Sequence, residues 1–169
     1  MSGRGYMTGY SDTEFSPRDT LSRAMFVTIL YRIAGEKVNA EETRFTDVPQ
    51  DTWYTEAVAW AVANGITSGT GDTTFSPDDP VTREQMATFI ERYVNSKALD
   101  LGAKHRTGEP DDLADGNAWG RNAMARAYEY GLLFTTNGKA YPLNNATRTD
   151  AVVAFHNLLC RDALVLFAE

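Results

Sequence analysis

The chain has 169 residues, of which 43% are hydrophobic and 11% aromatic, and its formal net charge is -7. This length and composition are sufficient for one compact domain with a hydrophobic core. The excess of acidic residues argues against a nucleic-acid or anionic-membrane surface, because long-range repulsion would oppose the encounter. The chain has no run of the roughly 20 apolar residues that a membrane span needs, and its first residues lack the apolar segment of a signal peptide. We therefore expect no nucleic-acid partner and no membrane insertion.

The sequence repeats itself. Residues 5–23 align with residues 65–83 at a constant spacing of 60, which pairs Gly9 with Gly69, Phe15 with Phe75, Pro17 with Pro77 and Arg23 with Arg83. A looser third copy places Asp115, Trp119 and Arg148 opposite Asp47, Trp53 and Arg83. The sequence therefore predicts three tandem repeats: the second half of repeat 1 in residues 1–38, a complete repeat 2 in residues 45–98, and a degenerate repeat 3 in residues 111–169.

Hydrophobic periodicity predicts an all-α fold with five principal helices, at residues 22–34, 54–64, 82–95, 118–130 and 147–160. The first, third and fifth of these each follow a Ser-Arg or Thr-Arg pair, and Thr82 with Gln85 has the spacing of a capping box. Their apolar stripes are the widest in the chain. Because one repeat alone cannot bury such a stripe, we expect these three helices to contact one another.

Arg23, Arg83 and Arg148 place a cation in the first turn of a helix, where the helix dipole disfavours it. A guanidinium beside free backbone N–H groups would form an anion receptor, because its planar fork can bind a carboxylate at two points. The alternative is an internal ion pair with a carboxylate such as Asp47, Asp72 or Asp79. The spacing alone does not decide between the two.

The order of these motifs resembles the S-layer homology family over nearly the whole chain. The middle copy carries FTDV, WY, an Ala-rich helix ending in Asn-Gly, TGTGDTTFSP and TREQ, and the corresponding motifs elsewhere are SRAM and TRTD. The resemblance implies a pseudo-threefold bundle of helix-loop-helix repeats. It also implies a non-catalytic module that anchors proteins to the bacterial cell wall through grooves between repeats.

In this family the ligand is a secondary cell-wall polysaccharide whose terminal sugar bears a pyruvyl ketal, and the motif arginine meets its carboxylate. The resemblance therefore nominates ligand-binding residues, with Arg83 leading: Arg83, Asp47, Trp53, Gly69, Arg23, Gly9, Arg148, Asp115 and Trp119. The aspartates would accept sugar hydroxyls and the indoles would stack on pyranose rings. The alternatives are a turn aspartate and a core tryptophan. The last motif position is acidic only in repeat 3, at Asp150, which should weaken the helix cap of repeat 1 more than the binding chemistry.

Repeat 1 lacks its front half, so one helix of a six-helix bundle is missing. We expect this to uncover Phe26, Ile29 and Ile33, so that a second copy or a partner chain completes repeat 1. Together with the erosion of repeat 3, it also predicts fewer than three working grooves. The same features favour an alternative function, a repurposed protein-protein interaction module that binds no glycan.

His105 and His156 have no spacing typical of a metal site or a catalytic triad, and no paired carboxylates suit glycoside hydrolysis. The loop around Asp72 is better explained as a turn than as a calcium loop. We therefore expect no enzyme activity, no metal and no cofactor. Cys160, the one cysteine, is expected to be buried. The expected location is the bacterial cell wall or S-layer, outside the cell if the chain is exported, although the chain shows no signal peptide.

Overall fold

The structure, a computed structural model, describes residues 5–7, 9, 14–37 and 43–165. Within this part the fold is all-α, as predicted, with isolated β-bridges and no strand. The five α-helices are α1 (Arg23–Ala34), α2 (Thr55–Ala63), α3 (Arg83–Ser96), α4 (Arg121–Glu129) and α5 (Arg148–Val165). A short 3-10 helix, η2 (Leu113–Asp115), precedes α4. None of the helices in the described residues is long and apolar enough to cross a membrane.

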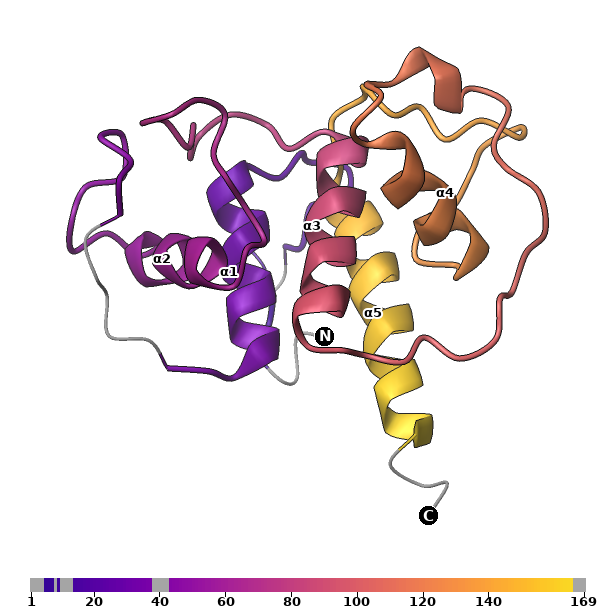
Figure 1. Cartoon of the computed structure of the whole chain (residues 1–169), viewed down its shortest axis with the longest axis horizontal. Helices are drawn as coiled ribbons and strands as arrows, with labels where there is room; N and C mark the ends of the chain where they lie inside the picture. The colour runs from indigo at the N-terminus through magenta and orange to yellow at the C-terminus, as the bar shows by residue number, and fades with distance from the viewer. Residues whose placement is uncertain (1–4, 8, 10–13, 38–42, 166–169) are drawn as a thin grey trace.

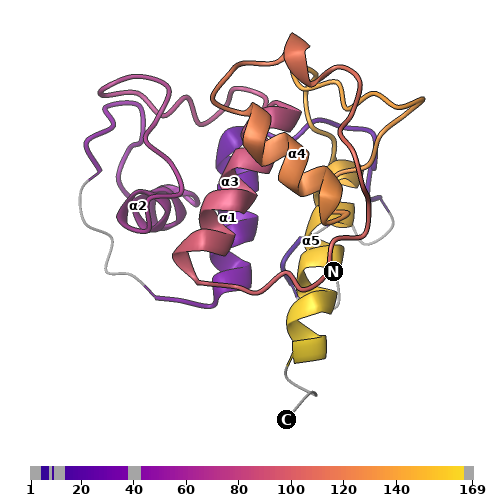
Figure 2. The same ribbon diagram turned by 45° about the vertical axis from the view of Figure 1, so that its right-hand side comes forward.

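α1, α3 and α5 form the centre of the molecule, side by side in a similar orientation (Figures 1 and 2). Their contact is made by aromatic side chains. The ring of Phe26 on α1 stacks on Phe89 of α3 at a centroid distance of 6.1 Å and on Phe155 of α5 at 5.0 Å. Phe26 and Phe155 are fully buried. The predicted contact between the three helices that follow the Ser/Thr-Arg pairs is therefore confirmed.

A closed ring of backbone hydrogen bonds joins the three repeats at the start of these helices. Leu21 N–H donates to the Ala146 carbonyl (3.1 Å), Ala146 N–H donates to the Val81 carbonyl (2.8 Å), and Val81 N–H donates to the Leu21 carbonyl (2.9 Å). Because each repeat both gives and accepts one bond, the first and last repeats are direct neighbours. The predicted pseudo-threefold bundle is built on this ring.

Each central helix is capped by the predicted Ser or Thr. The Ser22 Oγ accepts from Met25 N–H, and the Thr82 Oγ1 accepts from Gln85 N–H in a full capping box. The Thr147 Oγ1 accepts from Asp150 N–H, and Asp150 accepts in return from Thr147 N–H. Met25 has no acceptor suited to this return bond, so the cap of α1 is the simplest of the three.

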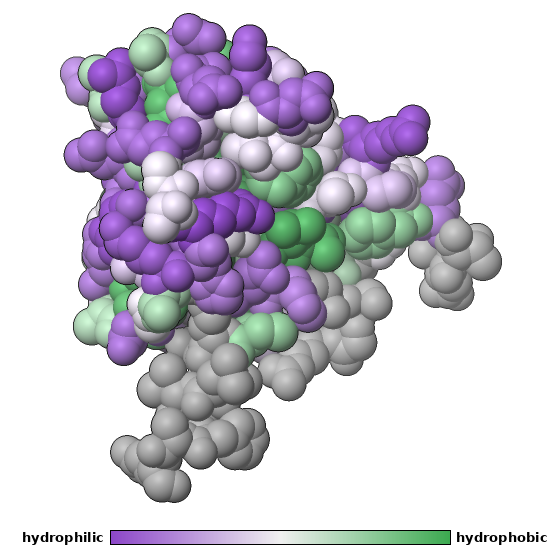
Figure 3. Space-filling model, turned by 90° about the vertical axis from the view of Figure 1, so that its right-hand side faces the viewer, coloured by the Kyte–Doolittle hydropathy of each residue, from purple (hydrophilic) through white to green (hydrophobic). Residues whose placement is uncertain are grey.

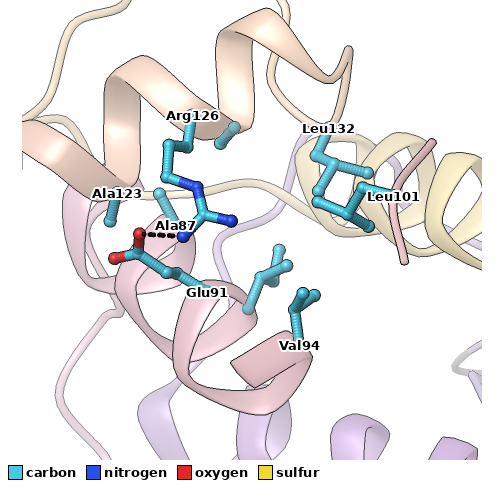
Figure 4. Close-up of a pocket in the computed structure, with 9 residues that line it drawn as sticks. Ala87, Glu91, Val94, Leu101, Ala123, Arg126 and Leu132 are labelled. Carbon is cyan, nitrogen blue, oxygen red and sulfur yellow. Dashed lines mark hydrogen bonds and ion pairs between the residues drawn. The ribbon is translucent and has the colours of Figure 1, made fainter. Parts of the chain in front are cut away.

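The front-half helices cover the central helix of the preceding repeat. α2 packs on α1, and α4 packs on α3. Figure 4 shows the second interface, where Ala87 and Val94 face Ala123 and Leu132, and where the Arg126 Nη1 lies 3.1 Å from the Glu91 Oε1. The space left between these side chains is about 10 Å³, no more than one water occupies. This is a packing interface rather than a ligand site.

This arrangement corrects the expectation that Phe26 and Ile29 are uncovered. Phe26 is fully buried, and Ile29 is 5% exposed, because α2 of the next repeat lies on α1. By the same rule, a front-half helix of repeat 1 would cover α5. No helix of the described part packs on α5 as α2 packs on α1. Whether a second copy or a partner chain completes repeat 1 stays a prediction.

α5 consequently exposes residues that we expected to be buried. His156 and Cys160 are exposed, and Val152, Val153 and Leu159 are half-buried. The expectation of a buried Cys160 thiol was wrong, since it assumed a neighbour on this side of the helix. Seen from the side of α4 and α5, the described surface is mostly hydrophilic, with one band of hydrophobic residues across it (Figure 3).

Candidate functional site

The motif arginines reach from one repeat into the next. The Nε of Arg23 donates to the Phe75 carbonyl (2.8 Å), that of Arg83 to the Ala140 carbonyl (2.7 Å), and that of Arg148 to the Phe15 carbonyl (2.8 Å). All three side chains are largely buried. The arginines therefore have a shared structural part, which is to hold the loop of the neighbouring repeat.

The backbone N–H groups beside these arginines are occupied. Arg23 N–H donates to Asp79, Arg83 N–H to Asn144 and Arg148 N–H to Asp19, each to a carbonyl oxygen at 2.9 Å. The next N–H groups, of Ala24, Glu84 and Thr149, donate to the carbonyls of Pro77, Pro142 and Pro17. The expectation of free N–H groups at the helix starts was therefore wrong, and an anion receptor cannot be built from them.

A groove of about 430 Å³, the Trp119 groove, combines side chains of all three repeats. Repeat 1 contributes Arg23, repeat 3 contributes Trp119, and repeat 2 supplies a loop and one side of α3. Trp119 is 54% exposed, so it is not a core residue. The lining consists of Arg23, Thr67, Ser68, Gly69, Thr70, Gln85, Thr88, Phe89, Arg92 and Trp119.

Arg23 is the charged group at one end of this groove. Its Nη1 donates to the Gln85 Oε1 (3.1 Å), and its guanidinium lies over the rings of Phe75 and Phe89. Burial lowers the pKa of Arg23 to about 10, and the carboxylates of Asp79 and Asp47 act in the opposite direction. At neutral pH Arg23 is therefore a cation whose positive charge is incompletely compensated by the protein.

The Trp53 groove is the equivalent site one repeat earlier, with a volume of about 240 Å³. Its arginine comes from repeat 3, its tryptophan from repeat 2, and its loop and helix from repeat 1. Trp53 is 58% exposed. The described residues that line it are Met7, Gly9, Leu21, Met25, Thr28, Ile29, Arg32, Trp53 and Arg148. The Oγ1 of Thr28, buried in this wall, has no hydrogen-bond partner among the described residues.

Arg83, the leading candidate from the sequence, lines neither groove. Its Nη1 forms an ion pair with Asp150, its Nη2 donates to the Phe134 carbonyl (2.6 Å), and the Phe134 ring lies 5.0 Å from the guanidinium carbon. The side chains of Arg83 and Asp150 are 8% and 4% exposed. Of the two interpretations left open, this geometry favours the internal ion pair for Arg83, with Asp150 in place of the three aspartates considered.

The aspartates also have structural contacts. The carboxylate of Asp47 accepts hydrogen bonds from the backbone N–H groups of Phe75 and Ser76. In repeat 3 the same contacts are made by Asp112, which accepts from Ala140 and Tyr141 N–H at 2.7 Å each. The equivalence of Asp115 with Asp47 is therefore corrected to Asp112, because the sequence alignment had not located the insertion at η2. Neither Asp47 nor Asp115 lines either groove.

Gly69 is required by the shape of its loop. Its φ is +89°, and a Cβ there would lie 2.5 Å from both the Phe45 ring and the Thr74 carbonyl oxygen. Gly9 lines the Trp53 groove at the corresponding position of repeat 1. The shortened loop of repeat 3 has no equivalent glycine, and Phe134 closes that interface.

Sequence reasoning missed Arg32, Arg92, Gln85 and Thr28. The signal that could have found the arginines was present, since Arg32 and Arg92 also obey the spacing of 60 and both follow a motif arginine by nine residues. In the described residues, no group of three or more His, Cys, Asp or Glu side chains is placed to hold a metal ion.

The fold and the two grooves define a module of three interlocked helical repeats, each groove being assembled from all of them. A family model described as the S-layer homology domain matches residues 1–25 and 44–87. The chain belongs to the S-layer homology family. Domains of this family are non-catalytic modules that anchor proteins to the cell wall.

Relatives of the chain include surface proteins and enzymes. It is 31% identical to the surface-layer 125 kDa protein of Lysinibacillus sphaericus over 89% of this chain and 13% of that protein. It is 36% identical to a cell surface protein of Thermoanaerobacter kivui (69% and 15%) and 30% identical to an amylopullulanase of Thermoanaerobacterium thermosulfurigenes (94% and 8%). The chain thus spans only a small part of each relative, and the enzyme name describes a protein of which 8% is matched.

Proposed function

We propose that this chain anchors to the bacterial cell wall by binding a carboxylate-bearing wall polysaccharide, at the cell surface, in the Trp53 and Trp119 grooves. The observation that carries the proposal is the repeated combination of an exposed tryptophan with a buried arginine in one groove. An indole offers a flat apolar face for a pyranose ring, and a guanidinium binds a carboxylate. The two groups lie together twice, at equivalent positions.

The electrostatics support an anionic ligand. Burial disfavours the Arg23 charge, so a ligand carboxylate beside it would stabilise the charged form that already exists at neutral pH. Elsewhere the net charge of -7 repels anions. Binding is therefore confined to the grooves, which favours recognition of a specific group over general adhesion to the wall.

We assign the carboxylate to a pyruvyl ketal, as the family resemblance implies, and we expect two working sites rather than three. At the third interface the ion pair with Asp150 neutralises Arg83, and Phe134 lies over its guanidinium. A soluble pyruvylated monosaccharide should accordingly bind with a stoichiometry of two per chain.

The test is co-sedimentation of the chain with purified bacterial sacculi that carry pyruvylated polysaccharide, before and after mild acid removes the pyruvate. We expect binding that is lost with the pyruvate. The double variant Trp53→Ala/Trp119→Ala should bind at least tenfold more weakly, because each lost stacking contact contributes about 1 kcal/mol. Tyr141→Ala is the matched control, since Tyr141 is also exposed (39%) but lies outside both grooves.

Three results would count against the proposal. Binding that survives pyruvate removal would overturn the assignment of the carboxylate, and full binding by the double variant would overturn the grooves. No binding of the wild-type chain to sacculi would overturn the anchor function and leave the alternative of a protein-protein interaction module.

A further inference from the structure

Each groove follows one stripe of a central helix, with an arginine at its far end. On α3 the stripe is Gln85, Thr88, Phe89 and Arg92, and on α1 it is Met25, Thr28, Ile29 and Arg32. These residues are spaced i, i+3, i+4 and i+7, so they lie on one face of the helix. The motif arginine is at the helix start, where Gln85 accepts from Arg23. Each groove therefore contains two arginines, one at each end of the stripe.

The two arginines of the Trp119 groove are held apart. Gln85, which contacts Arg23, and Arg92 are seven residues apart, which is ~10 Å along the helix axis. Arg23 is tied to the Phe75 carbonyl, and the Nη1 of Arg92 donates to the Ile66 carbonyl (3.2 Å). A carboxylate contacts a guanidinium nitrogen at about 2.7–2.9 Å, so one carboxylate at Arg23 leaves Arg92 without a share of it.

Arg32 and Arg92 have no carboxylate partner in the described structure. Both are exposed, and neither takes part in an ion pair there, whereas Arg83, Lys97, Lys104 and Arg126 each do. The carbonyl bond of Arg92 uses one of the five N–H donors of a guanidinium. Unpaired cations are thus kept inside the grooves of a protein that is acidic overall.

Repeat 3 shows that the helix needs no charge at this position. Asn157 lies on α5 where Arg92 lies on α3, and its Nδ2 donates to the Gly131 carbonyl at the end of α4 (2.7 Å). A neutral amide therefore suffices to hold the turn after the front-half helix. The arginine is present in both grooves that have an exposed tryptophan, and it is absent from the interface that Phe134 closes.

We infer that Arg32 and Arg92 bind a second anionic group, further along the same polysaccharide. This inference rests on the proposed function, and it defines the ligand class as a glycan with two negative groups on neighbouring residues. The second group is a carboxylate of an acidic sugar or a phosphate ester, since a guanidinium binds both. Two cations per groove also offset the repulsion between an acidic protein and a polyanion.

Three synthetic disaccharides test the inference by calorimetric titration. All carry the pyruvyl ketal on the first sugar, and the second sugar is a neutral hexose, a uronic acid or a hexose phosphate. The wild-type chain should bind at least one charged disaccharide about tenfold more tightly than the neutral one, as expected for one charge-assisted contact. Whichever charged form is preferred identifies the second group.

The double variant Arg32→Gln/Arg92→Gln should lose this preference and keep the affinity for the neutral disaccharide. Lys104→Gln/Lys139→Gln, which removes the same charge outside both grooves, should keep the preference. Equal affinity of the wild-type chain for all three disaccharides would overturn the inference alone. So would a double variant that weakens all three equally, since the arginines would then act on the first group or on the fold. No binding of any disaccharide would overturn the proposed function as well.

Discussion

Three equivalent arginines differ because of one residue in the neighbouring repeat. The last position of each Ser/Thr-Arg motif lies beside the arginine of the preceding repeat, so that Arg23 meets Gln85 and Arg83 meets Asp150. A neutral amide leaves the charge of Arg23 available to a ligand. A carboxylate compensates the charge of Arg83 inside the protein. In repeat 1 this position is Met25, whose thioether is at most a weak acceptor.

Arg83→Gln should therefore lower stability and leave glycan binding nearly unchanged. Its loss leaves the buried Asp150 carboxylate without its cation, which costs about 3 kcal/mol. The measurement is urea unfolding together with sacculus co-sedimentation. Arg121→Gln, an exposed arginine that lines neither groove, is the control for charge. A variant that keeps its unfolding midpoint and loses binding would show that Arg83 meets the ligand after all.

The kinds of residue in the site could be predicted from the sequence, and their pairing could not. Arg23, Arg148, Gly9, Gly69, Trp53 and Trp119 were nominated, and the structure brings them together in two grooves. The choice of Arg83 as the leading ligand residue required knowledge of which repeat lies beside which. That order is set by the backbone ring, whose bonds join residues more than 60 positions apart and leave no periodic signal in the sequence.

At the scale of the elements, helix positions were predicted to within three residues at most ends, because capping residues and apolar periodicity are local. The main difference is α5, which continues to Val165. α4 begins at Arg121 rather than near residue 118, and Gly120 before it offers no side-chain cap. Which helix covers which is a tertiary property, and the prediction for α1 failed there.

Glu36 links three helices and should make stability depend on pH. It follows α1, its Oε2 accepts from the buried Trp60 Nε1 of α2 (2.7 Å), and its Oε1 contacts Lys97 after α3 (2.5 Å). These bonds, that from Lys97 first, lower the pKa of Glu36. A depressed carboxyl pKa stabilises the fold above the unfolded-state value and loses this contribution as pH falls through the folded-state value.

Glu36→Gln should accordingly melt at a lower temperature than the wild-type chain at neutral pH. The difference between the two should shrink as pH falls below the ordinary glutamate range, since the wild-type carboxyl becomes neutral as well. Thermal melts across the acidic range measure this, with Glu56→Gln as the control at an exposed carboxyl of α2. A difference that stays constant with pH would mean that the charge of Glu36 contributes nothing.

At the scale of the whole molecule, ring closure distinguishes this protein from an open repeat array. In an open array each repeat contacts only its neighbours in sequence, and unfolding can proceed from the ends. Here repeat 3 contacts repeat 1 through the bonds from Leu21 to Ala146 and from Arg148 to Asp19. Each groove needs all three repeats, so partial unfolding of any one would remove both binding sites.

We therefore predict a single cooperative unfolding transition. Tryptophan fluorescence, which includes the buried Trp60, and far-ultraviolet circular dichroism, which reports all helices, should give the same midpoint. Phe26→Ala should shift both midpoints together, because Phe26 packs on Phe89 and Phe155, and a buried phenylalanine truncated to alanine costs about 3–5 kcal/mol. Residues 45–98 alone, which lack both neighbouring repeats, should be unfolded. Two separate transitions, or a folded fragment, would show that the repeats are stable units and that the ring only positions them.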